Sequence, residues 1–387
     1  MKGVGADLLA CLLDQRSRMI EFLEKLAVLE SPSSDAGTQS AVRALLAGAL
    51  ASLGFLTVEL AGRSSGGQLY ARPSQRDRAA PRQLLIGHFD TVWPVGTLGD
   101  MPFRVEGDIV RGPGVFDMKG GLVQIVFALS VIRELSLVTS VTPVVFLNSD
   151  EEIGSRESTR HIVRLARISD RALILEPSLG PAGAIKTARK GVGRYVVTVK
   201  GRAAHAGLDP EQGASAILEL SFVIQKLFQL NDPERGITVN VGTIDGGLRP
   251  NVIAPESKAV IDVRVATQED AERVHAAIHA LEPTTEGITL EVDGAIGRPA
   301  LEPTPRNQAL WRRAQVLGRE LGLELAEARA GGGSDGNTTS LYTATLDGLG
   351  PVGDGAHAHH EYLNIERTIE RAALLALLLL SPPLEEH

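Results

Sequence analysis

The sequence predicts an α/β protein into which a second, α+β unit is inserted, and two observations support this fold class. Strand-like apolar runs alternate with helix-like segments in the first half of the chain and again near its end. Between these parts the elements follow the order β-α-β-β-α-β, which is the order of a ferredoxin-like unit. We therefore predict a discontinuous outer domain over residues 1–187 and 302–387 and an inserted domain over residues 188–301.

The helices and strands of the outer domain follow from the spacing of its apolar residues. The predicted helices span residues 8–29, 40–53, 119–135 and 307–321, and the predicted strands span 57–60, 68–71, 84–86, 143–147 and 172–175. The last two strands are too uniformly apolar to have a face in water, so we expect a sheet with helices on both sides. The apolar run Ala372–Leu380 is about half as long as a membrane span, and it predicts a buried C-terminal helix.

The inserted domain is predicted from an alternating pattern that begins near Arg189. The segment RYVVTVK, residues 194–200, alternates as a half-exposed strand does. Further strands are predicted over 237–244, 258–265 and 288–292, and helices over 213–230 and 269–281. The two strands on either side of the GGLRPNVIAP loop are expected to pair with each other.

The composition excludes several classes of protein. Hydrophobic residues make up 43% and charged residues 22%, as in an ordinary globular protein. The net charge of -8, from 39 basic and 47 acidic residues, argues against binding to nucleic acid. Cys11 is the only cysteine, so neither an intrachain disulfide nor a cysteine-based zinc site can form. The N-terminus has charges inside its apolar stretch, which indicates an amphipathic helix rather than a signal peptide, so we expect a cytoplasmic protein with no membrane partner.

Five side chains of metal-binding type lie at the ends of apolar runs or in a late histidine cluster. They are His88, Asp117, Glu152, Glu176 and His357. Two imidazoles and three carboxylates are a natural ligand set for a pair of divalent cations, most often zinc. Each motif alone also fits a polar turn, an acidic loop or a surface histidine. Their repetition after successive strands has no such simple explanation, because ligands of open α/β sheets bind at that end of the strands.

Two further residues have predicted roles beside these ligands. Asp90 follows His88 by two residues, so its carboxylate can face the same way and orient the imidazole ring. Glu151 precedes Glu152, and two adjacent glutamates can divide their roles, one binding metal and one moving a proton.

These motifs, in this order, resemble the M20 family of metallopeptidases, especially its glutamate carboxypeptidase and acetylornithine deacetylase branch. The match runs over nearly the whole chain, through GHFDTV, GPGVFDMKGG, SDEEIGS, EPS, GRAAHAG, DVRV and the HxxxEY ending. The resemblance implies a mixed-sheet zinc-peptidase catalytic domain, with the insert serving as a ferredoxin-like lid and dimerisation domain. It also implies a non-proline cis peptide bond after Asp117.

The resemblance further implies how the ligands are shared between two zinc ions, with Co²⁺ or Mn²⁺ as alternatives. Asp117 would bridge both ions, His88 and Glu176 would complete one, and Glu152 and His357 would complete the other. Family members commonly place the last ligand four residues before the glutamate of the ending motif, which selects His357. Some relatives carry one extra residue, so His359 and His360 remain alternatives.

The implied chemistry is hydrolysis of an amide bond. Water between two cations loses its proton near neutral pH, and Glu151 is expected to take that proton and pass it to the leaving nitrogen. The resemblance implies that His205 stabilises the oxyanion from the partner subunit, which requires a homodimer built through the inserted domain.

Substrate recognition is predicted from three residues. Arg264 in IDVRV can hold a carboxylate through its bidentate fork, although it also fits a surface arginine on an alternating strand. Asn251 is expected to add a polar contact from the lid. Gly332 lies in the GGGSDGN loop, which either presents backbone N–H groups to the same carboxylate or is a flexible linker. Together they predict a small peptide or N-acyl amino acid with a free carboxylate.

Three functions fit this set of residues. The first is a zinc carboxypeptidase that releases a C-terminal amino acid, glutamate-like, from peptides or N-acyl conjugates. The second is an N-acyl-amino-acid deacylase of the acetylornithine deacetylase or aminoacylase type, and an aminopeptidase is a weaker alternative of the same class. The third is a non-catalytic binding protein on the same fold, which the complete set of ligands together with Glu151 argues against.

Overall fold

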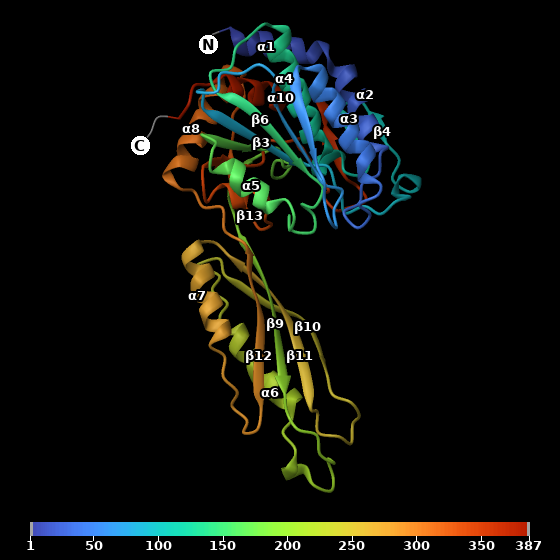
Figure 1. The fold of residues 1–387 in the computed structure, drawn as a ribbon, viewed down its shortest axis with the longest axis vertical. Helices are drawn as coiled ribbons and strands as arrows, with labels where there is room; N and C mark the ends of the chain where they lie inside the picture. Colours follow the sequence, from blue (N-terminus) through green and yellow to red (C-terminus); the bar gives the residue numbers. More distant parts are fainter. Residues whose placement is uncertain (1–2, 385–387) are drawn as a thin grey trace. The chain divides into compact units, whose positions relative to one another are not determined.

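The structure, a computed structural model, describes residues 3–384, and the chain divides into two compact units (Figure 1). Unit 1 ends at Ala188 and resumes over Pro303–Ala330 and from Ser334 onward. Unit 2 consists of Arg189–Glu302 together with Gly331–Gly333. Each unit has its own cluster of buried apolar side chains, so each is described by itself.

Unit 1 combines a layer of helices with a six-stranded sheet and smaller sheets. Its helices are α1 (Val4–Asp14), α2 (Arg16–Ala27), α3 (Gln39–Ser52), α4 (Gly120–Glu134), α5 (Thr159–Ala166), α8 (Pro305–Glu320), α9 (Asp335–Thr339) and α10 (Ile365–Leu380), with short helical turns η1 (Thr97–Gly99) and η2 (Val115–Lys119). Its strands are β1 (Phe55–Leu60), β2 (Gln68–Pro73), β3 (Arg82–His88), β4 (Arg104–Glu106), β5 (Ile109–Arg111), β6 (Thr142–Asn148), β7 (Arg171–Ile174), β8 (Ile185–Arg189), β13 (Glu327–Ala330), β14 (Ala344–Leu346), β15 (Gly353–Asp354) and β16 (Tyr362–Asn364).

The main sheet is mixed and has the strand order β1-β2-β6-β3-β7-β14. Strands β6, β3, β7 and β14 are parallel to one another, whereas β2 is antiparallel to β6 and to β1. Strand β3 therefore lies between β6 and β7, and the carboxyl ends of all three meet at one edge of the sheet. Ligands of open α/β sheets bind at such an edge.

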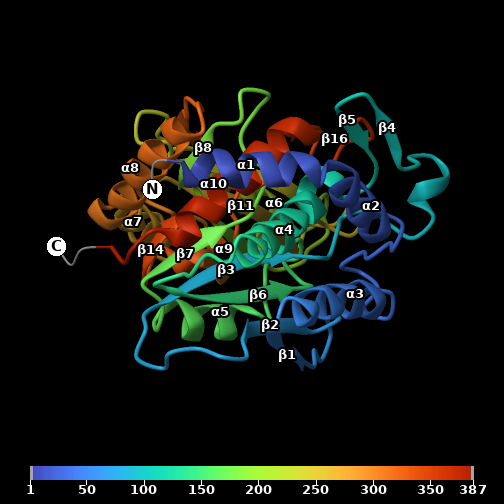
Figure 2. The same cartoon turned by 90° about the horizontal axis from the view of Figure 1, so that it is seen from above.

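Both faces of the central strands are buried, as their uniformly apolar sequences predict. Leu85, Val145 and Leu173 pack into the larger core with the helices α1, α2, α4, α8 and α10. Their chain neighbours, among them Ile86 and Phe146, face the opposite way into a second cluster with Ile162 of α5. Figure 2 shows α4, α1 and α10 on one side of the sheet and α5 on the other. The predicted covering of both faces by helices is confirmed.

The predicted C-terminal helix is also confirmed, because residues 372–379 of α10 are buried in the core against α4. Within residues 3–384, one helical stretch, Val115–Glu134, is long and apolar enough to cross a membrane, but 89% of its most apolar window is buried inside the protein. Packing against the neighbouring helices therefore accounts for its apolar sequence.

Three features of unit 1 differ from the prediction. The helix expected over residues 8–29 is two helices, α1 and α2, with a break at Gln15, where neither glycine nor proline stands. The buried Gln15 side chain donates hydrogen bonds to Glu134 Oε2 (2.9 Å) and Cys11 Sγ (3.4 Å), so a tertiary contact accompanies the break. The second difference is a set of short strands that the sequence analysis did not predict, in the sheets β15-β16-β5-β4 and β13-β8. The third is the presence of the short helices α5 and α9, which were also not predicted.

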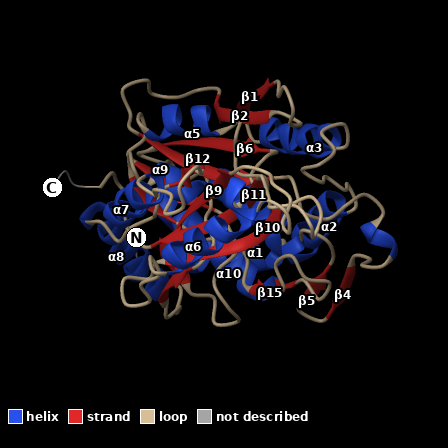
Figure 3. Cartoon of the chain, turned by 90° about the horizontal axis from the view of Figure 1, so that it is seen from below, coloured by secondary structure: helices blue, strands red, loops and turns tan. Residues whose placement is uncertain are grey.

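Unit 2 has the ferredoxin-like order that its sequence predicts. Its elements are β9 (Gly191–Lys200), the short turn η3 (Pro210–Gln212), α6 (Ala216–Phe228), β10 (Thr238–Gly246), β11 (Glu256–Val265), α7 (Gln268–His279) and β12 (Thr289–Arg298). The four strands form an antiparallel sheet in the order β10-β11-β9-β12 (Figure 3). The inward side chains of β9 and β11 share one core with α6 and α7. The expected pairing of β10 with β11 is confirmed, and β10 is an edge strand.

Candidate metal centre

The parallel strands of unit 1 bring three of the predicted ligands to one edge of the sheet. His88 is the last residue of β3, Glu152 follows the end of β6, and Glu176 follows the end of β7. Because β3 lies between β6 and β7, the histidine lies between the two glutamates.

The imidazole of His88 is oriented by Asp90 and faces two carboxylates. Its Nδ1 lies 3.0 Å from the Asp90 carbonyl oxygen and 3.4 Å from Asp90 Oδ1. Its Nε2 lies 3.4 Å from Asp117 Oδ1 and 3.5 Å from Glu176 Oε1. A hydrogen on Nδ1 would bond to Asp90 and leave the lone pair of Nε2 directed at the carboxylates, as a metal ligand requires.

Asp90 also holds the turn that carries both adjacent glutamates. Its carboxylate is fully buried and accepts hydrogen bonds from Ser33 Oγ (2.7 Å), from the Glu151 backbone N–H (3.3 Å) and from the Glu152 backbone N–H (3.2 Å). One carboxylate therefore fixes the end of β3 relative to the turn that follows β6. The contribution of Ser33 was not predicted, because nothing near Ser33 in the sequence marks it as a partner of Asp90.

Asp117 lies between the two histidines. Its Oδ1 faces His88, as given above, and its Oδ2 lies 3.3 Å from His357 Nε2. The same His357 nitrogen lies 3.1 Å from Glu152 Oε2. The His359 ring instead contacts the Trp93 ring in a tilted arrangement, with centroids 5.3 Å apart, and the His360 carbonyl accepts a hydrogen bond from Arg111. Of the three clustered histidines, it is therefore His357 that joins the carboxylates.

The glycine-dense segment around Asp117 is explained by close approach to its neighbours. Gly114 adopts a left-handed conformation (φ 72°), and a side chain at Gly121 would collide with the carbonyl of Leu175. The peptide bond between Asp117 and Met118 is cis, as the family resemblance implied. The segment thus turns from β5 into α4 within a few residues and leaves the Asp117 carboxylate at the sheet edge.

Glu151 lies beside this cluster as well. One of its carboxylate oxygens, a His88 ring nitrogen and a Glu176 carboxylate oxygen lie within 4.8 Å of one another. Ligand atoms of His88, Asp117 and Glu152 form a second group of the same size. The geometry therefore places Glu151 beside the candidate ligands His88 and Glu176.

The carboxylates of the cluster favour positive charge on the groups beside them. Hydrogen bonding to Asp117 and Glu152 raises the pKa of His357 to about 10. Burial opposes protonation of His88, yet its contacts with Asp117, Asp90 and Glu176 raise its pKa well above the ordinary value. Burial raises the pKa of Glu152, and the Asp117 carboxylate beside it acts in the same direction.

The same residues fit a pair of divalent cations. Two buried carboxylate oxygens, Asp117 Oδ1 and Glu152 Oε1, accept no hydrogen bond from any described residue. A buried acceptor without a donor is costly, and bound cations would satisfy both atoms and neutralise the carboxylates. With two imidazoles and several carboxylates, the donor set suits zinc, cobalt or manganese.

We expect zinc binding to release about two protons per chain at neutral pH, because neighbouring carboxylates raise the pKa values of His88 and His357 and both rings must be neutral to bind metal. Since both pKa values are raised, zinc affinity should increase as the pH rises through neutrality. Calorimetric titration in buffers of different ionisation enthalpy measures the released protons. A His357→Ala protein should release about one proton fewer and a His359→Ala protein the normal number. Binding heats that do not depend on the buffer would contradict the assignment.

Two predicted lid residues lie together at one end of unit 2. His205 forms a β-bridge with Val252, and the Asn251 carbonyl accepts a hydrogen bond from the Ala206 N–H (3.1 Å). His205 Nδ1 accepts hydrogen bonds from the backbone N–H groups of Gly207 and Leu208, both at 3.1 Å. Because Nδ1 is an acceptor, the hydrogen of the neutral ring is on Nε2, which is then a donor.

The other two predicted substrate residues belong to the opposite end of the same sheet. Arg264 pairs with Val192 near the start of β9 and donates a bidentate hydrogen bond to Asp262, at 2.8 and 3.1 Å. Gly332 accepts a hydrogen bond from Arg189, just before β9. Asn251 precedes the start of β11 at Glu256, so the strand's ten residues separate these ends by roughly 25 Å or more.

One residue that carries much of the site's geometry was not assigned a role from the sequence. Glu361 is buried and accepts hydrogen bonds from the backbone N–H of Asp117 and from three other donors. Burial raises the pKa of its carboxyl to about 7, although the N–H groups of Asp117 and Gly114 and the Trp93 indole oppose that shift. The ending motif contains this glutamate, so the signal was present, but its hydrogen-bond partners come from distant segments.

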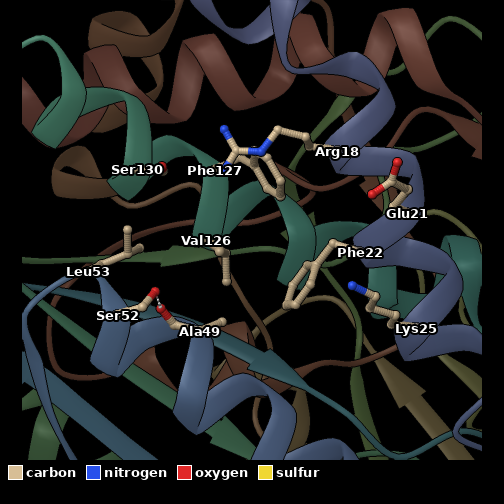
Figure 4. Close-up of a pocket in the computed structure, with 10 residues that line it drawn as sticks. All are labelled: Arg18, Glu21, Phe22, Lys25, Ala49, Ser52, Leu53, Val126, Phe127 and Ser130. Carbon is tan, nitrogen blue, oxygen red and sulfur yellow. Dashed lines mark hydrogen bonds between the residues drawn. The ribbon is translucent and has the colours of Figure 1, made fainter.

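A separate cavity of about 240 Å³ lies between α2, α3 and α4 (Figure 4). Phe22, Val126 and Phe127 line it together with the charged side chains of Arg18 and Lys25. None of the predicted site residues lines this cavity, so it does not belong to the metal centre.

Comparison with known proteins agrees with this arrangement. Residues 187–282 match the family described as a peptidase dimerisation domain. Carboxypeptidase G2 of Pseudomonas sp. (strain RS-16) is 31% identical over 377 residues, which cover 95% of this chain and 90% of that protein. Succinyl-diaminopimelate desuccinylase of Xanthomonas oryzae pv. oryzae is 27% identical over 354 residues, covering 86% and 89% of the two chains.

The fold also matches solved structures. YXEP of Bacillus subtilis, described as a dinuclear metal-binding peptidase of the M20 family, superposes with a TM-score of 0.69 at 14% identity. The match covers 94% of this chain and 97% of that one. At this identity the superposition establishes the shared fold alone.

Proposed function

Because this chain belongs to the M20 family of metallopeptidases, we propose that it is a dinuclear zinc carboxypeptidase that releases a C-terminal, glutamate-like amino acid from peptides or N-acyl conjugates. Its relatives place it among hydrolases that act on C–N bonds. The observation that carries the proposal is the convergence of two histidines on the two oxygens of Asp117.

The proposed ligand sets follow from the contacts around Asp117. Asp117 would bridge two cations, with His88 and Glu176 completing one and Glu152 and His357 completing the other. When bound, the cation pair polarises the scissile carbonyl and lowers the pKa of water. Asp90 holds the His88 ring and the backbone of residues 151 and 152, so it keeps a ligand and the proposed base in fixed relation.

Glu151 is the proposed general base. Its carboxylate lies beside the proposed ligands His88 and Glu176. Glu151 follows the same strand as Glu152, but neither proposed ligand set includes it. It would take a proton from the attacking water and deliver it to the leaving nitrogen.

Replacing Glu151 with glutamine is expected to lower kcat by roughly 100-fold or more, because the amide cannot accept and return the proton. The Glu151→Gln protein should still bind two zinc ions per chain, which atomic absorption measures beside the rate. The Glu152→Gln protein is the matched comparison and should lose metal. Near-normal turnover in Glu151→Gln, or loss of one zinc ion, would remove Glu151 from the role of base.

His205 is the proposed oxyanion donor, acting on the active site of the partner subunit. Its Nδ1 accepts two backbone hydrogen bonds, which leaves Nε2–H as the donor that a developing oxyanion needs. Within one chain, His205 and Asn251 lie roughly 25 Å or more from Arg264, too far to contact the same small substrate. A site that uses all three residues therefore needs two chains, with His205 and Asn251 from one and Arg264 from the other.

The surface of unit 2 offers a face for this second copy. Helix α6 exposes the apolar side chains of Ile217 (49%), Leu218 (51%), Phe222 (37%) and Phe228 (48%). The edge strand β10 adds Ile244, which is 65% exposed. An apolar helix face next to an unpaired strand edge is typical of an interaction surface, and the matched dimerisation domain includes both elements. We therefore assign the homodimer interface to α6 and β10.

Mixed dimers test this arrangement. His205→Ala and Glu151→Gln homodimers should each be nearly inactive, whereas a heterodimer contains one site with an intact Glu151 and an intact His205 from the partner. We expect verified heterodimers, isolated with two different affinity tags, to regain up to about half of the wild-type activity. Heterodimers as inactive as the parents would contradict catalysis across the interface.

Arg264 is the proposed anchor for the substrate carboxylate, with Gly332 near the same end of unit 2. The guanidinium makes a bidentate pair with Asp262, and this contact with a carboxylate supports the proposal. A substrate carboxylate would compete with Asp262 for this fork.

The Arg264→Ala protein is expected to raise KM about tenfold or more for a substrate with a free carboxylate, and much less for the corresponding amide. Arg194 stands directly opposite Asp262 on β9, so Arg194→Ala is the matched control for loss of a nearby positive charge. Steady-state kinetics on the acid and amide pair measures the difference. Equal effects of Arg264→Ala on both substrates would exclude it as the carboxylate anchor.

The deacylase alternative is supported by the similarity to a desuccinylase. Both reactions cleave an amide next to an amino acid with a free carboxylate, so the same centre serves either. A panel of dipeptides, folate-like glutamate conjugates and acetyl-amino acids distinguishes them. The proposal expects the highest kcat/KM for peptidyl or acyl conjugates of glutamate, and a preference for acetyl-amino acids would establish the deacylase instead.

A further inference from the structure

A single buried carboxylate, that of Glu361, holds the segment that carries Asp117. Its Oε1 accepts hydrogen bonds from the backbone N–H groups of Phe116 (2.9 Å) and Asp117 (3.0 Å). Its Oε2 accepts from the Gly114 N–H (2.9 Å) and from the Trp93 indole N–H (2.8 Å). Glu361 is only 1% exposed, and each of its two carboxylate oxygens accepts two of these hydrogen bonds.

The sheet β15-β16-β5-β4 brings Glu361 next to the segment that carries Asp117. Tyr362, the first residue of β16, pairs with Arg111, the last residue of β5. Glu361 therefore lies next to the chain that leaves β5 toward Asp117. His357 precedes Glu361 by four residues, and backbone hydrogen bonds from Glu361 N–H to the Ala358 carbonyl and from Ala358 N–H to the Gly355 carbonyl make that connection compact.

We propose that Glu361 is a positioning residue for the metal centre, and this proposal rests on the proposed function. Its carboxylate fixes the backbone of residues 114–117 and is joined through a short turn to His357. It thereby sets the relation between Asp117 and His357, two ligand candidates that the chain separates by more than half its length. Glu361 itself faces backbone N–H groups and an indole rather than the cations.

The four donors explain why a carboxylate is needed at this position. An ionised carboxylate accepts up to about four hydrogen bonds, two on each oxygen, which matches the observed set. A glutamine of the same size would turn its NH₂ group toward two N–H donors, and a buried donor that faces donors is unsatisfied. An aspartate keeps the charge but is one methylene shorter, so it cannot reach all four donors without movement of the backbone.

The test compares Glu361→Gln and Glu361→Asp with Glu366→Gln, a matched control at an exposed glutamate nearby. Zinc affinity is measured by competition with a chelator above neutral pH, and the visible spectrum of the cobalt-substituted protein reports ligand geometry. We expect Glu361→Gln to weaken zinc binding on the order of 10- to 100-fold and to alter the cobalt spectrum. Glu361→Asp should recover part of the loss, and Glu366→Gln should match the wild type.

Wild-type affinity and spectrum in Glu361→Gln would overturn the proposal. If Glu361→Gln does not fold, Glu361→Asp carries the test, and wild-type values in that protein would overturn the proposal in the same way. Either result, obtained while the wild type binds two zinc ions and hydrolyses its substrate, leaves the proposed function intact. A wild-type protein that binds no divalent metal would instead contradict the proposed function.

Discussion

Carboxylates that meet at a buried sheet edge repel one another unless positive charge lies between them, and the architecture of unit 1 depends on this constraint. Asp117, Glu152 and Glu176 converge there because three parallel strands and one glycine-rich turn end at the same edge. The same carboxylates raise the pKa values of His88 and His357 and so favour the positively charged form of each ring. A pair of divalent cations supplies positive charge without protons, so the same geometry that costs free energy in the metal-free protein creates affinity for metal.

Two further buried carboxylates, which are not candidate ligands, position the residues of the metal centre. Asp90 fixes the His88 ring and the turn of Glu151 and Glu152, while Glu361 fixes the backbone that carries Asp117. Each of these two carboxylates is satisfied by several N–H or O–H donors, so neither depends on the cations for its own hydrogen bonds. These two carboxylates therefore position the candidate ligands through hydrogen bonds that do not involve the cations.

Much of this could be predicted from the sequence because the signals were local. The strands β6 and β7 are largely apolar, and residues of metal-binding type lie at the end of β3 and within four residues after β6 and β7. The ferredoxin-like order of unit 2 was likewise visible in its alternating strands. What the sequence could not provide were contacts between distant segments, such as the bond from Gln15 to Glu134 that accompanies the break between α1 and α2. Strands as short as β5 and β16 carry too few residues to show a period, yet their pairing is what brings Glu361 to Asp117.

The central claim is that Asp117 would lie between two cations, with His88 and Glu176 completing one ligand set and Glu152 and His357 completing the other. Diffraction from crystals of the zinc-loaded protein, with data collected on both sides of the zinc absorption edge, tests it most directly. The account predicts two anomalous peaks per chain, one between His88, Asp117 and Glu176 and the other between Asp117, Glu152 and His357. A single peak, or peaks that do not contact Asp117, would contradict it.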